Sequence, residues 1–163
     1  MGPKDVIRMV IETNDMVITT YLQDLSDAEL LVRPTPNANH VAWQLGHLIH
    51  SEVQMLEAFQ GVPKVTLPAG FDKQHSKETS AIDPPKGFRT KAEYLELYKK
   101  VRGNTLKILS ELSDADLDRP TQGDMAKFFP TWGAMLTVIG DHPMMHAGQI
   151  AVLRRKLGKP IVM

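Results

Sequence analysis

The spacing of apolar residues along the chain predicts long helices. Apolar side chains recur every three or four positions in four stretches, at about residues 5–25, 39–60, 90–112 and 131–157. That period is typical of helices that bury one face. No segment shows the sustained alternation of a β-strand. We therefore predict an all-α fold, a four-helix bundle, in which residues 1–163 form a single domain.

Local signals refine this prediction. The apolar stripe of the first stretch is formed by Val6, Val10, Val17 and Tyr21. Asn14 lies inside that stripe, so we expect its amide either to have a hydrogen-bond partner or to line a cavity. Thr90 and Glu93 have the spacing of a capping box at the start of the third helix. Gly158 and Pro160 are stop signals at the end of the fourth.

A short motif occurs twice, at residues 25–35 and 112–121. In each copy the letters LSDA are followed by an Arg-Pro pair, so the serine can cap a helical turn and the proline can end it. Each copy follows a long predicted helix. We therefore expect a short helical turn in each of these two connections. Two similar caps and an ancestral duplication explain the pattern equally well.

The connection between the second and third predicted helices, residues 61–89, is unusually long. It contains Pro63, Pro68, Pro84 and Pro85. Loops of this length inside compact domains are uncommon and often cover a functional site. The segment equally suits a crossover between the two halves of the bundle. We expect a long crossover between helices two and three.

Composition narrows the classes of function. Hydrophobic residues make up 42% of the chain, and 19 basic residues balance 19 acidic ones. This balance gives neither a basic surface for nucleic acid nor a polybasic patch for a membrane. The N-terminus lacks a signal-peptide pattern, and no apolar run approaches the ~20 residues of a membrane span. We expect a cytoplasmic protein. The absence of cysteine excludes disulfides, thiolate ligands and a cysteine nucleophile.

Two histidines share one face of the fourth predicted helix. His142 and His146 are four residues apart, and their face is the apolar stripe of that helix. Such a pair can supply two ligands to one metal ion, but a hydrogen-bonded core without metal explains the spacing equally well. The residues between them include no glutamate, so the zinc-protease helix is excluded. A carboxylate-bridged di-iron bundle is excluded as well, since no Glu-x-x-His pair occurs on two helices.

His47 of the second predicted helix lies opposite the main aliphatic stripe of that helix, beside Trp43. Periodicity alone favours a solvated face for it. A tryptophan one turn away favours burial, because its large apolar ring would be wasted in contact with water. A helix flanked on both sides can bury both faces. The residues of this helix leave these alternatives open.

Two sequence blocks carry a resemblance to a known family. They are NHVAWQLGHL at residues 39–48 and DHPMMHAGQIAVLRRKLGKP at residues 141–160. Through them the chain resembles the DinB-like superfamily of damage-inducible, metal-binding four-helix bundles, which also includes bacillithiol transferases and a mycothiol-dependent isomerase. The pattern of four helices with a long connection between helices two and three extends the resemblance over essentially the whole chain.

The resemblance implies a site with one metal ion. One histidine of helix two and two of helix four bind it in the family, and the matching residues here are His47, His142 and His146. Zinc or nickel is the expected ion, and three protein ligands leave positions open for water or substrate, as in catalytic sites. His40 and His50 match no family ligand and are expected at the surface or behind the ligands. His75, in the loop, is expected to have no specific role.

The resemblance also implies a function. A metal-dependent S-transferase would activate a low-molecular-weight thiol against a small-molecule electrophile; a hydrolase or a non-catalytic, stress-response metal-binding bundle is the alternative. Asn14, Trp43 and Gln149 are the expected pocket-lining residues. Arg154 and Arg155 are expected as surface or helix-end charges.

Two further expectations concern surfaces and helix geometry. Exposed methionines would allow two chains to pair as a homodimer, with Met9, Met16 and Met144 as candidates. Pro143 should kink the fourth helix, or Asp141 should cap a new one there. Either way the carbonyl of residue 139 loses its usual partner and needs another.

Overall fold

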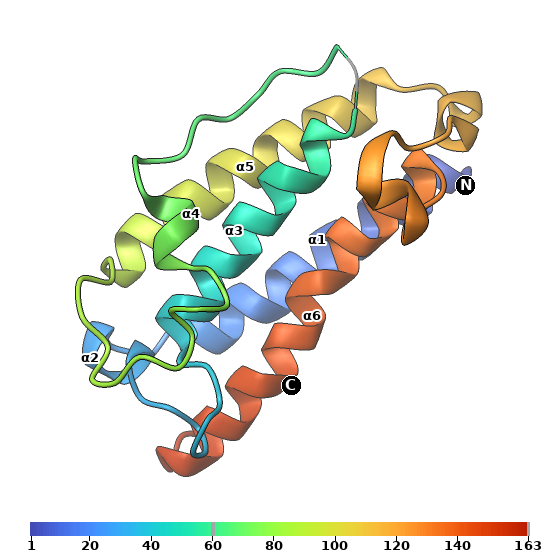
Figure 1. Cartoon of the computed structure of the whole chain (residues 1–163). Coiled ribbons are helices and arrows are strands. Elements are labelled where there is room, and N and C mark those ends of the chain that lie inside the picture. Colours follow the sequence, from blue (N-terminus) through green and yellow to red (C-terminus); the bar gives the residue numbers. More distant parts are fainter. Residues whose placement is uncertain (60, 163) are drawn as a thin grey trace.

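The computed structural model describes residues 1–59 and 61–162, and it confirms the predicted all-α fold (Figure 1). The long helices of this part of the chain are α1 (Pro3–Leu22), α3 (Val41–Glu57), α5 (Lys91–Glu111) and α6 (Trp132–Lys156). The short helices there are α2 (Asp27–Leu30), α4 (Phe71–Gln74) and two 3₁₀ turns, η1 (Asp114–Asp118) and η2 (Gly123–Lys127). The second helix was predicted to reach Gln60, which lies outside the described residues.

The four long helices pack in pairs. The most extensive helix contact joins α1 and α6, followed by the contact between α3 and α5, and α3 also lies against α6. Figure 1 shows that α3 and α5 run in the same direction, so the chain between them must travel back along the bundle. This return path explains the long connection and confirms the predicted crossover.

Apolar side chains form two core clusters, one toward each end of the bundle. On α6, one cluster ends at Ile139 and the other begins at Ala147. The level between them holds most of the buried polar side chains of the four long helices. From α1 to α6 these are Asn14, Glu52, Arg102, Thr105 and His146. The candidate chemistry of the protein therefore lies at mid-length in the bundle.

The buried stripe of α1 corrects one expectation. Val6 is 44% exposed, whereas Ile7 and Ile11 are buried. Val6 and Val10 have the same helical spacing as Ile7 and Ile11, and the contact with α6 buries the isoleucines. Met9, Met16 and Met144 are exposed, as the predicted homodimer requires, and the homodimer itself stays a prediction.

Both copies of the repeated motif form the predicted helical turn. The Ser26 side chain caps α2, and the Ser113 side chain caps η1, each in a capping box. Thr90 and Glu93 form the predicted capping box of α5, and Gly158, with φ +69°, follows α6.

The long connection is anchored to the bundle. Phe71 of α4 is buried in a core cluster, and His75 beside it is only 1% exposed. The His75 ring nitrogens lie 2.7 Å from the Phe71 carbonyl oxygen and 2.8 Å from the Tyr94 hydroxyl. Further along, the Arg33 guanidinium pairs with Asp83 at 2.9 Å. His75 therefore holds the loop in place, which corrects the expectation that it has no specific role.

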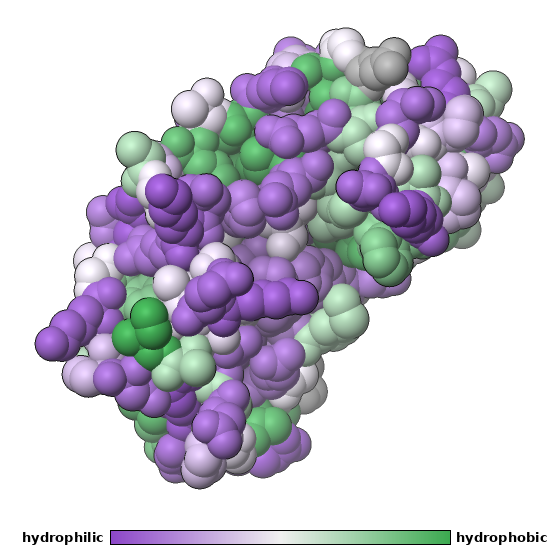
Figure 2. Space-filling model, in the orientation of Figure 1, coloured by the Kyte–Doolittle hydropathy of each residue, from purple (hydrophilic) through white to green (hydrophobic). Residues whose placement is uncertain are grey.

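The surface in Figure 2 is mostly hydrophilic, with separate apolar patches. Within the described residues, no helix combines the length and the apolar character that crossing a membrane requires.

Candidate metal centre

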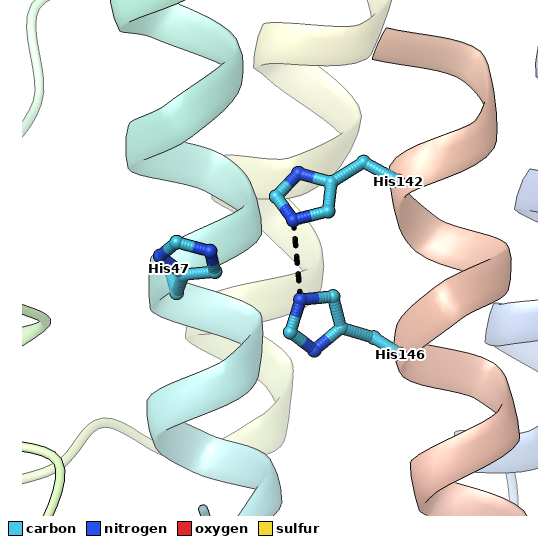
Figure 3. A group of neighbouring side chains, drawn as sticks. All are labelled: His47, His142 and His146. Carbon is cyan, nitrogen blue, oxygen red and sulfur yellow. Dashed lines mark hydrogen bonds between the residues drawn. The ribbon is translucent and has the colours of Figure 1, made fainter. Parts of the chain in front are cut away.

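Three histidine side chains converge between α3 and α6 (Figure 3). One nitrogen of each of His47, His142 and His146 lies within 4.8 Å of the others. The Nε2 atoms of His142 and His146 are 3.2 Å apart, and the His47 and His142 ring centroids are 5.1 Å apart. The four-residue spacing places two of the rings on the same face of α6, edge to face, while packing of α3 on α6 supplies the third.

Gln44 fixes the ring of His146. The Gln44 amide nitrogen donates to the Asn39 carbonyl at 2.7 Å, so its Oε1 faces His146 and accepts from the imidazole Nδ1 at 2.9 Å. The proton on Nδ1 leaves the Nε2 lone pair directed at the cluster, the arrangement that supports metal-ligating histidines. Sequence reasoning missed Gln44, although it lies inside the block at residues 39–48 that carries the family resemblance.

Trp43 holds His47 from the other side. The two rings stack with centroids 5.0 Å apart and an interplanar angle of 9°. The indole Nε1 donates to the Ser76 carbonyl at 3.1 Å and lies 3.3 Å from the Thr79 hydroxyl. Trp43 is 4% exposed. The alternative of a solvated face is therefore excluded, because the loop covers this side of α3.

Burial keeps the three imidazoles neutral. Desolvation is the largest cause that lowers the pKa of His142 to about 4 and the pKa of His146 to about 3, and the neighbouring histidines add to it. The pKa of His47 is lowered mainly by burial, with smaller contributions from His50 and Lys77. Neutral imidazole is the form that binds metal ions, so all three rings are available as ligands near neutral pH.

A cavity of about 270 Å³ opens beside the cluster. Its walls are formed by His47, Ser51, Gln54, Met55, Met125, Phe129, Val138, His142 and Met145. Methionine, phenylalanine and valine make up the majority, and among the described residues no Lys, Arg, Asp or Glu lines it. The cavity therefore suits an apolar or polarisable group next to the histidines.

The three residues expected to line a pocket lie in different places. Trp43 supports His47 from behind. Asn14 lies at another cavity, which it shares with Asp141, and donates to the Gly140 carbonyl at 3.0 Å. Gln149 is exposed and is not among the residues that line the cavity at the histidines.

The remaining candidates also have defined positions. His40 is fully buried and caps α3, since its Nδ1 accepts from the Trp43 backbone N–H at 3.2 Å. His50 is half-buried and lines a separate cavity beneath the 64–70 segment. Arg154 is buried as well and pairs with Asp24. It lies in the last turn of α6, so of the two expected positions it has the helix end and not the surface. The opposite charge of Asp24, just after the end of α1, makes this burial possible.

Pro143 does not divide α6, which continues from Trp132 to Lys156. Asp141 therefore does not begin a new helix. The carbonyl of Ile139, which Pro143 deprives of its usual donor, receives the Arg102 guanidinium at 3.3 and 3.4 Å. The expectation that this carbonyl needs another partner is confirmed.

Comparison with known proteins identifies the family of this chain. The model of the DinB superfamily matches residues 11–150. A conserved protein from Enterococcus faecalis shares the fold, with a TM-score of 0.69 and 17% identity over 98% of this chain and 99% of that one. A search of curated proteins finds no match. Because the family model covers most of the chain, including the three histidines, this protein belongs to the DinB superfamily.

Proposed function

We propose that His47, His142 and His146 bind one divalent metal ion, zinc or nickel, and that the protein uses it to activate a low-molecular-weight thiol. The observation that carries the proposal is the convergence of three neutral imidazoles within 4.8 Å. His146 is buried and His142 is half-buried. Their Nε2 atoms, 3.2 Å apart, can share only one hydrogen bond, so a shared cation is a better partner for their lone pairs.

The donor set fits such an ion. Two nitrogens bound at about 2.05 Å to one tetrahedral zinc lie about 3.3 Å apart, close to the 3.2 Å between His142 and His146. Histidine ligands suit zinc and nickel. Three protein ligands leave at least one position for a substrate atom, as in catalytic zinc sites.

The chemistry assigns distinct tasks to the protein and its substrate. A bound divalent ion supplies Lewis acidity, which lowers the pKa of a coordinated thiol or water. The chain contains no cysteine, so the nucleophilic sulfur must arrive with a small molecule. In the transfer, the thiolate sulfur forms a bond to an electrophilic carbon, the leaving group departs with the bonding electrons, and the thiol proton goes to solvent. Gln44 and Trp43 hold His146 and His47 in position for this.

The surroundings of the cluster suggest how the two substrates are divided. The methionine and phenylalanine walls of the cavity favour an apolar electrophile. We therefore place the apolar electrophile in this cavity, toward Phe129, and the thiol beside the histidines.

The first experiment measures metal content. Untagged protein, loaded with zinc or nickel and dialysed, should contain about one ion per chain, while His47→Ala and His142→Ala variants should lose it. His50→Ala is the matched control, because His50 lies on the same helix outside the cluster, and it should keep the ion. Protein that takes up neither ion would refute the metal centre.

The second experiment tests thiol transfer. Metal-loaded protein is incubated with a thiol and an aryl chloride, and release of chloride is followed with and without a chelator. The proposal expects transfer that the chelator and His142→Ala both abolish. Metal binding without transfer for any thiol tested would instead support the alternative, a non-catalytic metal-binding bundle.

A further inference from the structure

The helix that carries two of the candidate ligands contains a break in its hydrogen bonding. Pro143 lies inside α6, one residue after His142 and three before His146. Its ring nitrogen has no hydrogen to donate to the carbonyl of Ile139, and prolines in helix interiors usually kink the axis for this reason. Ile139 is 1% exposed, so water does not readily replace the lost donor.

Arg102 of α5 supplies the missing donor. Its two terminal nitrogens lie 3.3 and 3.4 Å from the Ile139 carbonyl oxygen. Arg102 itself is 3% exposed. A buried guanidinium is costly to desolvate, and here it meets a carbonyl that would otherwise be buried without a partner.

Three neighbours hold the guanidinium in place. Its Nε lies 3.2 Å from the Asp15 carboxylate of α1, and its Nη2 lies 3.2 Å from the Glu52 carboxylate of α3. The same Nη2 donates to the Tyr98 hydroxyl at 3.1 Å. Residues of α1, of α3 and of α5 itself therefore contribute to the position of Arg102, which in turn contacts α6.

The next carbonyl of α6 is held in a similar way. Asn14 of α1 donates to Gly140 at 3.0 Å. A side chain at Gly140 would meet α1, since an added Cβ would lie 3.0 Å from Ile11 and 3.1 Å from Val10. The absence of that side chain lets the two helices approach closely enough for the Asn14 contact.

We propose that Arg102 is a positioning residue for the candidate metal centre: it replaces the donor that Pro143 removes and thereby sets the direction of the part of α6 that carries His142 and His146. The proposal rests on the proposed function in one respect, that these histidines bind metal. The hydrogen-bond substitution itself can be tested on the metal-free protein.

A simpler role for Arg102 would be to neutralise Asp15 and Glu52. The two roles respond differently to Pro143→Ala, which restores a backbone N–H at position 143 and with it the bond to Ile139. A neutralising arginine is needed equally with either residue at 143. A positioning arginine becomes less important once the helix satisfies its own carbonyl.

The test compares the parent, Arg102→Lys, Pro143→Ala and the double variant, because lysine keeps the positive charge but lacks the planar fork. One measurement is the affinity for Co²⁺, read from the visible absorption of the bound ion. The other is urea unfolding of the metal-free proteins. Arg154→Lys, made in both backgrounds, is the matched control: Arg154 is also buried, paired with an aspartate and bonded to a backbone carbonyl, that of Tyr21.

We expect Arg102→Lys to weaken Co²⁺ binding about tenfold, a typical cost for disturbing the support of a ligand, and to alter the absorption spectrum. In the Pro143→Ala background the same change should cost less than about twofold, and its effect on the urea midpoint should shrink as well. Arg154→Lys should lower the midpoint equally in both backgrounds and leave Co²⁺ binding unchanged. An Arg102→Lys loss of equal size in both backgrounds, or a failure to fold in both, overturns the proposal.

The outcomes also separate this proposal from the metal centre. If the parent binds no Co²⁺, the metal centre fails, and the urea data alone decide whether Arg102 substitutes for the missing donor. If the parent binds Co²⁺ and Arg102→Lys binds it equally well with the same spectrum, the metal centre stands and the positioning role is refuted.

Discussion

Gly46 shows how one small residue allows the loop to reach the helix that carries His47. A Cβ built at Gly46 would overlap the ring of His75. That ring bridges the Phe71 carbonyl and the Tyr94 hydroxyl. The glycine therefore serves packing rather than backbone freedom, and it lies next to a candidate ligand. Its role depends on a residue 29 positions away along the sequence.

Gly46→Ala should consequently destabilise the protein. The methyl group must displace His75, and overpacking of this kind costs about 1–3 kcal/mol of unfolding free energy, which urea denaturation measures. Gly103→Ala is the control: no neighbour lies within 4 Å of an added Cβ there, so alanine should stabilise α5 by about 0.5–1 kcal/mol. Equal effects of the two variants would contradict this account.

His40 provides a second prediction at the residue scale. Burial lowers its pKa from 6.5 to about 4, so the folded protein binds the proton less tightly than the unfolded chain does. Above pH 6.5 His40 is neutral in both states, and the free energy of unfolding has its full value. As the pH falls toward 4, the unfolded chain takes up the proton first, and the free energy of unfolding drops by about 1.4 kcal/mol per pH unit in that window. His40→Asn keeps a capping oxygen for α3 without a titrating group.

Urea unfolding of both metal-free proteins at several pH values between 7.5 and 4.5 tests this prediction. Glu52, whose pKa burial raises to about 7, acts in the opposite sense, because its proton is bound more tightly in the folded state. The difference between the two proteins isolates His40. We expect His40→Asn to lose less stability on acidification than the parent. Parallel curves for the two proteins would show that His40 does not contribute.

At the scale of elements, the chain uses side chains to complete helix ends and breaks. The end of α1 has no glycine cap. Lys91 at the start of α5 donates instead to the carbonyl of Leu22, the last residue of α1, and to those of Gln23 and Leu25 in the turn that follows. Arg102 does the same for the interior of α6. In both cases a cation on α5 satisfies backbone groups of another helix, so α5 fixes the geometry of its neighbours.

Lys91→Met should therefore weaken the junction between α1 and α5. The charge at a helix C-terminus and its hydrogen bonds are together worth about 1 kcal/mol, and we expect a loss of this size in thermal or urea unfolding. Lys100→Met changes an exposed lysine of the same helix and should have little effect. A similar loss in both variants would point to a general effect of charge removal rather than to the helix end.

At the scale of the whole molecule, the two apolar clusters meet at a polar level that contains both the histidine cluster and the Arg102 network. Metal binding there should link the α3–α5 pair of helices to the α1–α6 pair, because the candidate ligands lie on α3 and α6. If the ion binds only the folded protein, its stabilisation grows with metal concentration, so zinc at about 100 times its dissociation constant should add roughly 2.7 kcal/mol. Thermal unfolding with and without zinc measures this, with His142→Ala as the control that should not respond.

The features of this protein that depend on local geometry were predictable from its residues alone. The four helices, the capping box at Thr90, the serine cap at Ser26, and the placement of His142 and His146 on one face all follow from the geometry of residues three or four apart. The lost donor at Ile139 was predictable for the same reason, since it follows from a proline four positions later. The family resemblance added His47 to the pair.

Which surfaces meet depends instead on how distant parts of the chain pack. Ile7 rather than Val6 is buried because α6 packs on that side of α1, and both have the same helical period. Gln44, Arg102 and His75 acquire their roles from partners that lie 102, 37 and 19 residues away. No local pattern encodes such distant contacts, because they depend on how the loop and the helices pack together. Packing of α3 against α6 likewise brings His47 to the other two histidines.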